Sequence, residues 1–151
     1  MFHGSLSKFA DQINELMPQV IQGFARRQAN ELYKGKITLP QFLILEFLSR
    51  KGESRMTDMA RCMHVTTAAM TGMVERLVGY GYVERVYDLK DRRTIRIRLT
   101  PSGNSLIKKI NEQRRRMVIN IFGGIPENDR REYLKILTQV RENLIKEDSP
   151  L

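Results

Sequence analysis

Hydrophobic residues recur at helical spacing along the first part of the chain. The i, i+3, i+4 pattern begins near Leu6 and continues to about Tyr33, which predicts one long amphipathic helix. Pro18 lies inside this pattern and has no backbone N–H to donate. We therefore expect a kink or a break in the helix one turn before it.

A second helix is predicted to start at Thr38-Leu39-Pro40-Gln41, which has the residues of a capping box. In that motif the Thr38 hydroxyl accepts from the third helical residue, Gln41, whose side chain reaches back to the cap. The helix is expected to end near Arg50, with Gly52 closing it. Its expected core residues are Phe42, Leu45, Phe47 and Leu48.

Two shorter helices joined by a tight turn follow. Thr57 is the expected cap of the first, from Asp58 to about Met63, and the second begins at Thr66 or Thr67. One face of the second helix is apolar at helical spacing, with Met70, Met73, Val74 and Leu77. This arrangement is typical of a helix-turn-helix, in which the second helix reads DNA.

The outer face of that reading helix carries small and hydroxyl-bearing side chains. A helix enters the major groove only if its leading face is not bulky, and threonine and alanine can contact base edges and the thymine methyl group. The candidate DNA-binding residues on this helix are Thr66, Thr67, Ala68, Thr71 and Arg76. The alternative is that the threonines only cap a helix whose remaining surface is ordinary.

A β-hairpin is predicted directly after the reading helix. The segment from Tyr82 to Tyr87 is rich in valine and tyrosine, and the segment from Thr94 to Thr100 alternates strictly between polar and apolar residues. The loop between them covers about residues 88–93. A helix-turn-helix followed by a hairpin is a winged helix, and the hairpin is its wing.

Charge is concentrated in the same region. The chain has a formal net charge of +9, and residues 50–98 hold 11 Lys and Arg against six Asp and Glu. Such an excess favours an acidic partner, either nucleic acid or an anionic membrane face, although many charge runs are only solvated surface. Lys90, Arg92 and Arg93 lie at the expected wing tip, where they would reach the groove or phosphates of a duplex.

Two long helices complete the pattern. Thr100-Pro101 is a strong helix start, the helix continues to about Phe122, and Pro126 opens a last helix. The apolar stripes are Leu106, Ile110, Met117 and Ile121 on the first, and Tyr133, Ile136, Leu137, Val140 and Leu144 on the second. A small winged domain cannot cover such long stripes, so a second copy of the chain is the expected partner. An intramolecular bundle is the alternative.

The sequence gives little indication of disulfide, metal-binding or catalytic chemistry. Cys62 is the single cysteine, so no internal disulfide is possible, which fits a reducing cytoplasm. We expect Cys62 to be a small buried residue, and with too few ligands nearby no metal site or cofactor is expected. No secretory signal or membrane span is visible. No phosphate-binding loop or nucleophile elbow is visible either, and this second absence argues against an enzyme.

Taken together, these motifs resemble the MarR family of bacterial and archaeal transcription regulators. The wing signature of that family is Asp-x-Arg, five residues, then Leu-Thr, and Asp91, Arg93, Leu99 and Thr100 occupy its fixed positions. The order of the preceding motifs and the long flanking helices also match. They include Thr57 to Ala60, Thr71 to Leu77 and Gly81 to Arg85.

The resemblance implies a homodimer that reads a roughly palindromic site in double-stranded DNA. Many members release DNA when a small anionic or phenolic effector binds. By position, Asp91 would brace the wing by pairing with a nearby arginine, Arg93 would be the wing-tip arginine, and Arg92 would contact the backbone or a groove. Members that sense oxidants place a cysteine in the N-terminal helix, where this chain has none.

The resulting prediction is a mainly α fold with a small β-hairpin wing. Residues 1–151 form one domain, with a winged helix-turn-helix lobe at about 38–100 and dimerisation helices at about 1–35 and 101–151. The predicted function is a cytoplasmic, sequence-specific transcription regulator that represses as a homodimer and is released by a small ligand. The alternative is a winged-helix module for protein–protein contact or non-specific nucleic-acid binding.

Overall fold

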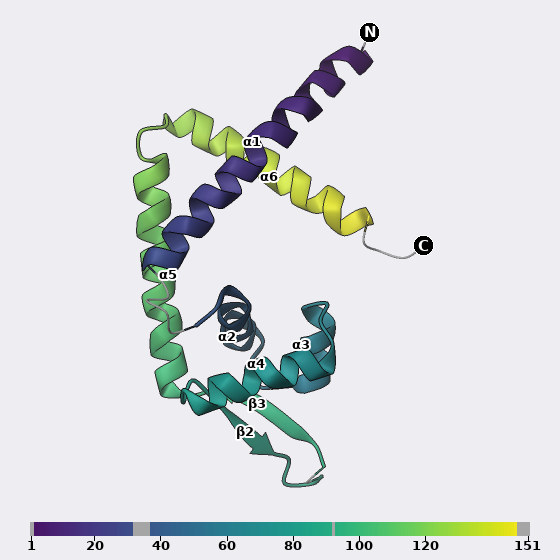
Figure 1. Ribbon diagram of the computed structural model, residues 1–151, viewed down its shortest axis with the longest axis vertical. Coiled ribbons are helices and arrows are strands. Elements are labelled where there is room, and N and C mark those ends of the chain that lie inside the picture. The colour runs from purple at the N-terminus through teal and green to yellow at the C-terminus, as the bar shows by residue number, and fades with distance from the viewer. Residues whose placement is uncertain (1, 32–36, 92, 148–151) are drawn as a thin grey trace. The chain divides into compact units, whose positions relative to one another are not determined.

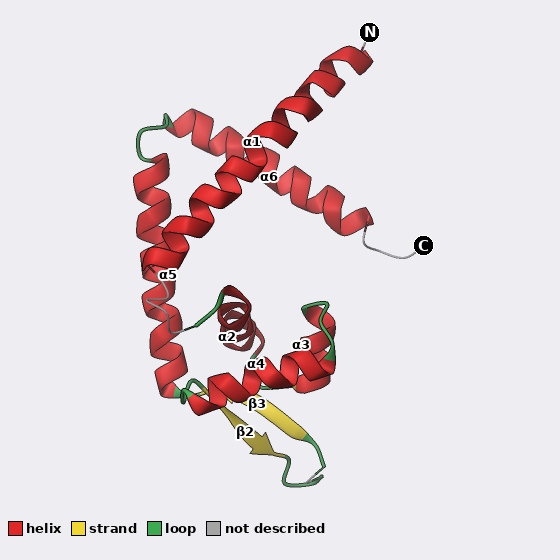
Figure 2. Ribbon diagram, in the orientation of Figure 1, coloured by secondary structure: helices red, strands yellow, loops and turns green. Residues whose placement is uncertain are grey.

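The computed structural model describes residues 2–31, 37–91 and 93–147. It has the predicted mainly α architecture with a small antiparallel sheet, coloured by chain position in Figure 1 and by structure type in Figure 2. The elements are α1 (Phe2–Glu31), α2 (Leu39–Lys51), β1 (Ser54–Arg55), α3 (Met56–Cys62), α4 (Thr67–Gly79), β2 (Val83–Tyr87), β3 (Ile95–Leu99), α5 (Pro101–Phe122) and α6 (Glu127–Glu147).

The start of α2 confirms the predicted capping box. The backbone N–H of Thr38 donates to Gln41 Oε1 at 2.9 Å, and the N–H of Gln41 donates to Thr38 Oγ1 at 3.4 Å. Gly52 ends the helix with a φ of 77°, in the left-handed region that favours glycine. Phe42, Leu45 and Leu48 are buried as predicted, Phe47 is half-buried, and Ile44 is fully buried although it was not predicted. Ile44 is covered because α2 contacts both α4 and β3 and so buries more than one stripe.

The sheet has the strand order β1-β3-β2, and the two-residue strand β1 was not predicted. Ser54 pairs with Ile97 and Arg55 with Arg96. Because β1 runs directly into α3, the N-cap of α3 is Arg55, which makes no side-chain capping bond. The prediction of Thr57 as the cap was therefore wrong, since Thr57 already lies inside the first turn.

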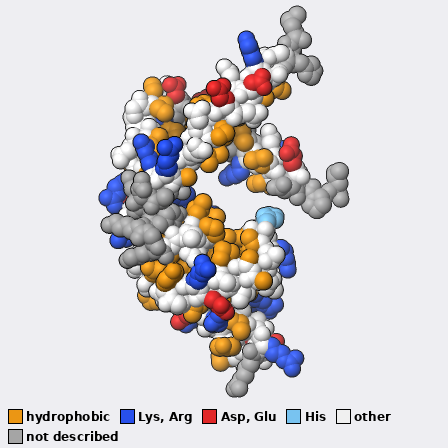
Figure 3. Space-filling view, viewed as in Figure 1, with side chains coloured by type: hydrophobic (Ala, Val, Ile, Leu, Met, Phe, Trp, Pro, Cys, Tyr) orange, Lys and Arg blue, Asp and Glu red, His pale blue; other side chains and the backbone are white. Residues whose placement is uncertain are grey.

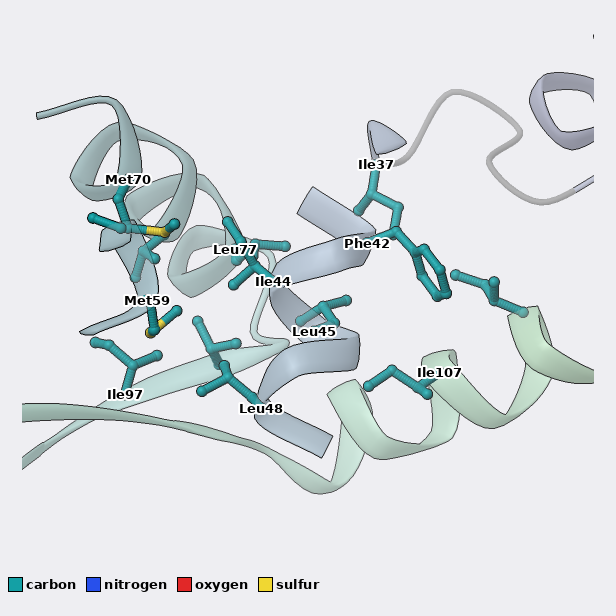
Figure 4. Packing of buried hydrophobic residues seen from close by; sticks show 14 residues of the cluster. Ile37, Phe42, Ile44, Leu45, Leu48, Met59, Met70, Leu77, Ile97 and Ile107 are labelled. Carbon is teal, nitrogen blue, oxygen red and sulfur yellow. The ribbon is translucent and has the colours of Figure 1, made fainter. Parts of the chain in front are cut away.

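The core of the lobe joins α2, α3, α4, β3 and the first half of α5. Figure 4 shows the side chains of these elements pointing toward one another. Fully buried members include Ile44, Leu45, Met59, Met70, Val74, Leu77 and Ile97, and Ile107 and Ile110 of α5 close one side. This burial holds α4 by one face only, so its opposite face is left at the surface.

Helix α1 is continuous through Pro18, so the break does not occur, and the alternative of a kink stays a prediction. The residues around Pro18 are exposed, and water can satisfy the backbone carbonyl that loses its helical donor. Residues 32–36, which include the predicted end near Tyr33, lie outside the described part of the chain.

The junction between the wing and α5 depends on Thr100. Its hydroxyl donates to the carbonyl of Gly81 at 2.5 Å and accepts from the N–H of Gly103 at 3.1 Å, which confirms the predicted helix start. The N–H of Thr100 donates to the carbonyl of Tyr82 at 3.1 Å. Gly103 is needed here because a Cβ at this position would lie 2.1 Å from the Tyr82 carbonyl oxygen.

The long outer helices carry apolar side chains that remain exposed. In α1 they are Leu6, Phe9, Leu16, Met17, Val20 and Ile21. In α6 they are Tyr133, Leu134, Ile136, Leu137, Val140, Leu144 and Ile145. Near the start of α6, the ring of Tyr133 lies 5.6 Å from that of Phe122 between ring centres. No helix in the described ranges is both long and apolar enough to cross a membrane.

Replacing Gly103 with alanine tests the junction. The added methyl group must displace the Tyr82 carbonyl or the start of α5, so Gly103→Ala is expected to lower the free energy of unfolding by about 2–3 kcal/mol. Gly72→Ala in α4 is the matched control, because a Cβ there meets nothing within 4 Å. It should raise the free energy of unfolding by roughly 0.5–1 kcal/mol. Urea denaturation at one protein concentration measures both, and equal effects would contradict the close approach at Gly103.

Candidate nucleic-acid interface

The N-terminal part of α4 presents the side chains that were predicted to read DNA. Met70, Val74 and Leu77 bury the opposite face with no measurable exposure. Thr66, Thr67 and Ala68 are exposed, Thr71 is half-buried, and Arg76 is exposed in the last turn. The structure thus brings four of these five residues together at one end of the helix.

The three threonines differ in how far their hydroxyls are already engaged. Thr66 is the N-cap, and its Oγ1 accepts from the N–H of Ala69 at 3.1 Å. Thr71 Oγ1 donates to the backbone carbonyl of Thr67 at 2.8 Å. The Thr67 hydroxyl has no hydrogen-bond partner among the described residues. Thr67 is therefore the side chain of this group that is most available to an external partner.

Arg76 occupies a different part of the helix. It lies eight residues after Ala68, a distance of about 12 Å along an α-helix. The two residues lie within about a quarter turn of each other, so Arg76 continues the Ala68 side of α4. A long cation at this distance from the leading end suits a phosphate contact better than a base contact.

Two aspartates accept hydrogen bonds within the wing-tip loop. Asp88 Oδ1 accepts from the N–H of Lys90 at 2.9 Å, and Asp91 Oδ1 accepts from the N–H of Arg93 at 3.0 Å. Asp91 Oδ2 also accepts from the Thr94 hydroxyl at 3.3 Å. Backbone bonds from Asp88 N–H to Thr94 and from Thr94 N–H to Asp91 close the loop.

Asp91 therefore contacts the loop itself, whereas the family resemblance implied an arginine as its partner. Within the described residues, Asp91 makes no ion pair with an arginine. Arg92, one of the predicted contact residues, lies outside the described residues. The bracing role and the functions of the two wing arginines stay predictions.

The cations of the wing fall into two groups. Arg98 is held by Glu84, with Nε 2.6 Å from the carboxylate, and by Glu53 at 3.4 Å, and the Glu84 carboxylate raises the pKa of Arg98. Lys90 and Arg93 are exposed and have no ion-pair partner in the part of the chain that the structure describes. The two aspartates of the loop accept hydrogen bonds from the loop, and these two exposed cations are available to a partner outside the chain.

Cys62 is exposed at the end of α3, so the prediction that it is buried was wrong. The core side of this short helix is occupied by Met59 and Ala60, and Cys62 falls on the other side. Across the described ranges, no three His, Cys, Asp or Glu residues are grouped in a way that could hold a metal ion.

A sequence model of the MarR family matches residues 37–95, which contain α2, the helix-turn-helix and most of the wing. Over this segment the chain matches the MarR family. Among curated relatives, it is 29% identical over 89 residues to the uncharacterized HTH-type transcriptional regulator YpoP of Bacillus subtilis, covering 59% of this chain and 63% of YpoP. It is 25% identical over 126 residues to the HTH-type transcriptional repressor MdtR of the same species, covering 81% of each chain.

Solved structures of the family share the fold. A MarR family protein from Bacillus stearothermophilus has a TM-score of 0.83 at 22% identity, covering 92% of this chain and 97% of the other. Bordetella bronchiseptica BpsR, whose DNA binding is regulated by 6-hydroxynicotinic acid, has a TM-score of 0.68 at 23% identity, covering 86% and 98%. Because both structures are less than 25% identical to this chain, the likeness shows the fold alone.

Removing the Asp91 carboxylate tests whether it organises the wing-tip loop. Asp91→Ala deletes the acceptor for the Arg93 N–H, so the amide of Arg93 is expected to exchange with solvent about fivefold to tenfold faster. Lys90→Ala, which leaves both aspartates in place, is the control. Hydrogen exchange followed by NMR measures the rates, and an unchanged rate for Arg93 would show that Asp91 does not hold the loop.

Proposed function

We propose that this chain is a MarR-family, sequence-specific transcription regulator that binds double-stranded DNA as a homodimer. The observation that carries the proposal is the pairing of two exposed features on one lobe. These are the leading end of α4, where the Thr67 hydroxyl has no hydrogen-bond partner among the described residues, and a wing tip whose Lys90 and Arg93 have no ion-pair partner there either. One feature suits base edges in the major groove, and the other suits phosphates or the adjacent minor groove.

The homodimer is supported by the outer helices. The apolar side chains of α6 are between 40% and 63% exposed in a single chain, and α1 carries a comparable set. Covering such stripes in water is favourable by about 25 cal/mol per Å² of apolar surface. A second copy with the same stripes is the simplest partner, and its two reading helices would fit a roughly palindromic site.

We further propose that the chain is a repressor released by a small anionic or phenolic effector. The name of MdtR supports repression, and the control of BpsR by 6-hydroxynicotinic acid supports an effector of this chemistry. We expect the protein to act in the cytoplasm, because a transcription regulator must reach the chromosome. The rival function is a winged helix used for protein contact or for binding nucleic acid of any sequence, and sequence discrimination separates the two.

Thr67→Ala tests the reading function. A duplex is first enriched from a random pool by the wild-type protein. On that duplex the variant should lose about 1–3 kcal/mol of binding free energy if Thr67 contacts a base, with a much smaller loss on a random duplex. Thr57→Ala is the matched control, since Thr57 is exposed and lies in the first turn of α3. Equal losses on both duplexes would assign Thr67 to the phosphate backbone.

The mass of the free protein tests the homodimer. Light scattering should give about twice the chain mass of 17.6 kDa. Leu137→Glu places a charge within the exposed stripe of α6 and is expected to shift the mass toward one chain. Glu142→Lys changes the charge on the opposite face of α6 and should leave the dimer intact. A wild-type protein that stays monomeric at micromolar concentration would contradict the proposal.

A further inference from the structure

An apolar strip continues the core face of the hairpin toward the wing tip. Tyr87 pairs with Ile95 and Arg85 with Ile97, and residues directly opposite each other on antiparallel strands share a face. Along this face the exposed fraction rises from 0% at Ile97 to 39% at Ile95 and 59% at Tyr87. Leu89, in the loop beyond the strands, is fully exposed at 101%. We call Tyr87, Leu89 and Ile95 the wing strip.

The strand part of the wing strip lies on the side of the hairpin that faces α4. Arg85 shares this face, and its guanidinium group lies 3.6 Å from the carboxylate of Glu75 in α4. The opposite face carries Glu84 and Arg98, which pair with each other. If α4 lies in the major groove of a duplex, the DNA strand that borders this groove therefore passes on the side of the hairpin that carries Tyr87 and Ile95.

The charges around the strip indicate what covers it. Lys90 and Arg93 flank Leu89 and Ile95 in sequence and have no ion-pair partner within the described residues. Figure 3 shows hydrophobic side chains beside Lys and Arg side chains at the lower end of the molecule, where the wing lies. A second copy of the same strip would bring these cations against each other. The sugar–phosphate backbone fits better, because it offers apolar deoxyribose edges between anionic phosphates.

We propose that the wing strip packs against deoxyribose rings of the duplex, with the Tyr87 hydroxyl donating to a neighbouring phosphate. This inference rests on the proposed DNA-binding function and adds a contact of a different kind. Cation–phosphate contacts release counterions, so their strength falls as salt rises. Apolar packing against sugars releases no counterions. The wing strip therefore supplies a part of the affinity that does not depend on salt.

The experiment compares four variants on the duplex enriched by the wild-type protein, with fluorescence anisotropy across a series of salt concentrations. Tyr87→Ser and Leu89→Ser each remove one apolar side chain of the strip. Both side chains are exposed, so the variants should fold, and circular dichroism checks this. Tyr80→Ser is the matched control, an exposed tyrosine outside the wing at 54% exposure. Lys90→Ala is the charge control.

Tyr87→Ser and Leu89→Ser should each weaken binding roughly threefold to tenfold and leave the slope of log K against log salt unchanged. Lys90→Ala should flatten the slope by about 0.9, and Tyr80→Ser should change neither quantity. Wild-type affinity in both strip variants would overturn the inference while the proposed function stands. A flattened slope in those variants would overturn it too, because the strip would then act through charge.

Two further outcomes have a clear meaning. If Leu89→Ser lowers the mass of the free protein in light scattering, the strip is covered by a second copy and the inference is wrong. If the wild-type protein enriches no sequence and binds no duplex, the proposed function fails and the inference fails with it.

Discussion

Thr100 joins the three segments that place the wing beside the reading helix. Its hydroxyl donates to Gly81, just after α4, and caps α5 through Gly103, while its backbone N–H binds Tyr82 at the start of the wing. The end of α4, the base of the hairpin and the start of α5 therefore meet at one residue. Gly81 turns the chain there with a φ of 79°, which suits glycine and few other residues. The closeness of Gly103 to the Tyr82 carbonyl shows how little space the junction leaves.

Function in this lobe follows from what the packing leaves uncovered. The core holds α4 through Met70, Val74 and Leu77, so the threonines at its leading end face outward. On the wing, Asp88 and Asp91 accept hydrogen bonds from the loop, whereas Lys90 and Arg93 have no ionic partner in the described chain. The acidic groups are engaged by the loop, whereas the two basic groups are exposed and available to an anionic partner. A polyanion in contact with both α4 and the wing satisfies both features.

Local signals in the sequence were enough to predict much of this arrangement. The capping box at Thr38, the glycine at position 52 and the strict alternation before Thr100 each act within a few residues, and all appear in the structure. Features that depend on distant partners were missed. Strand β1 has only two residues, which is too short for a periodic pattern. Its residue Ser54 pairs with Ile97, which is distant in sequence, so the sequence pattern could not predict β1. Because β1 ends at Arg55, α3 begins at Met56 and Thr57 is not its cap.

The remaining differences between the sequence predictions and the structure have similar physical causes. Cys62 belongs to a seven-residue helix, too short for its hydrophobic pattern to tell the buried side from the exposed one. Water can satisfy the backbone carbonyl that Pro18 leaves without a donor because the residues around it are exposed, and the exposure of α1 could not be judged from its own residues. The partners of Asp91 are nearby donors in a loop, where sequence spacing does not decide between a backbone N–H, a hydroxyl and an arginine.

The central claim is that α4 and the wing of each copy contact one duplex together. Hydroxyl-radical footprinting of the enriched duplex, which reports the exposure of each deoxyribose, tests it most directly. The account predicts two protected clusters related by two-fold symmetry, with centres separated by about one helical turn or a multiple of it. Each cluster should include sugars along the minor groove next to the major-groove contact, and Leu89→Ser should expose some of these. Uniform weak protection along the duplex, or a single cluster without symmetry, would contradict the account.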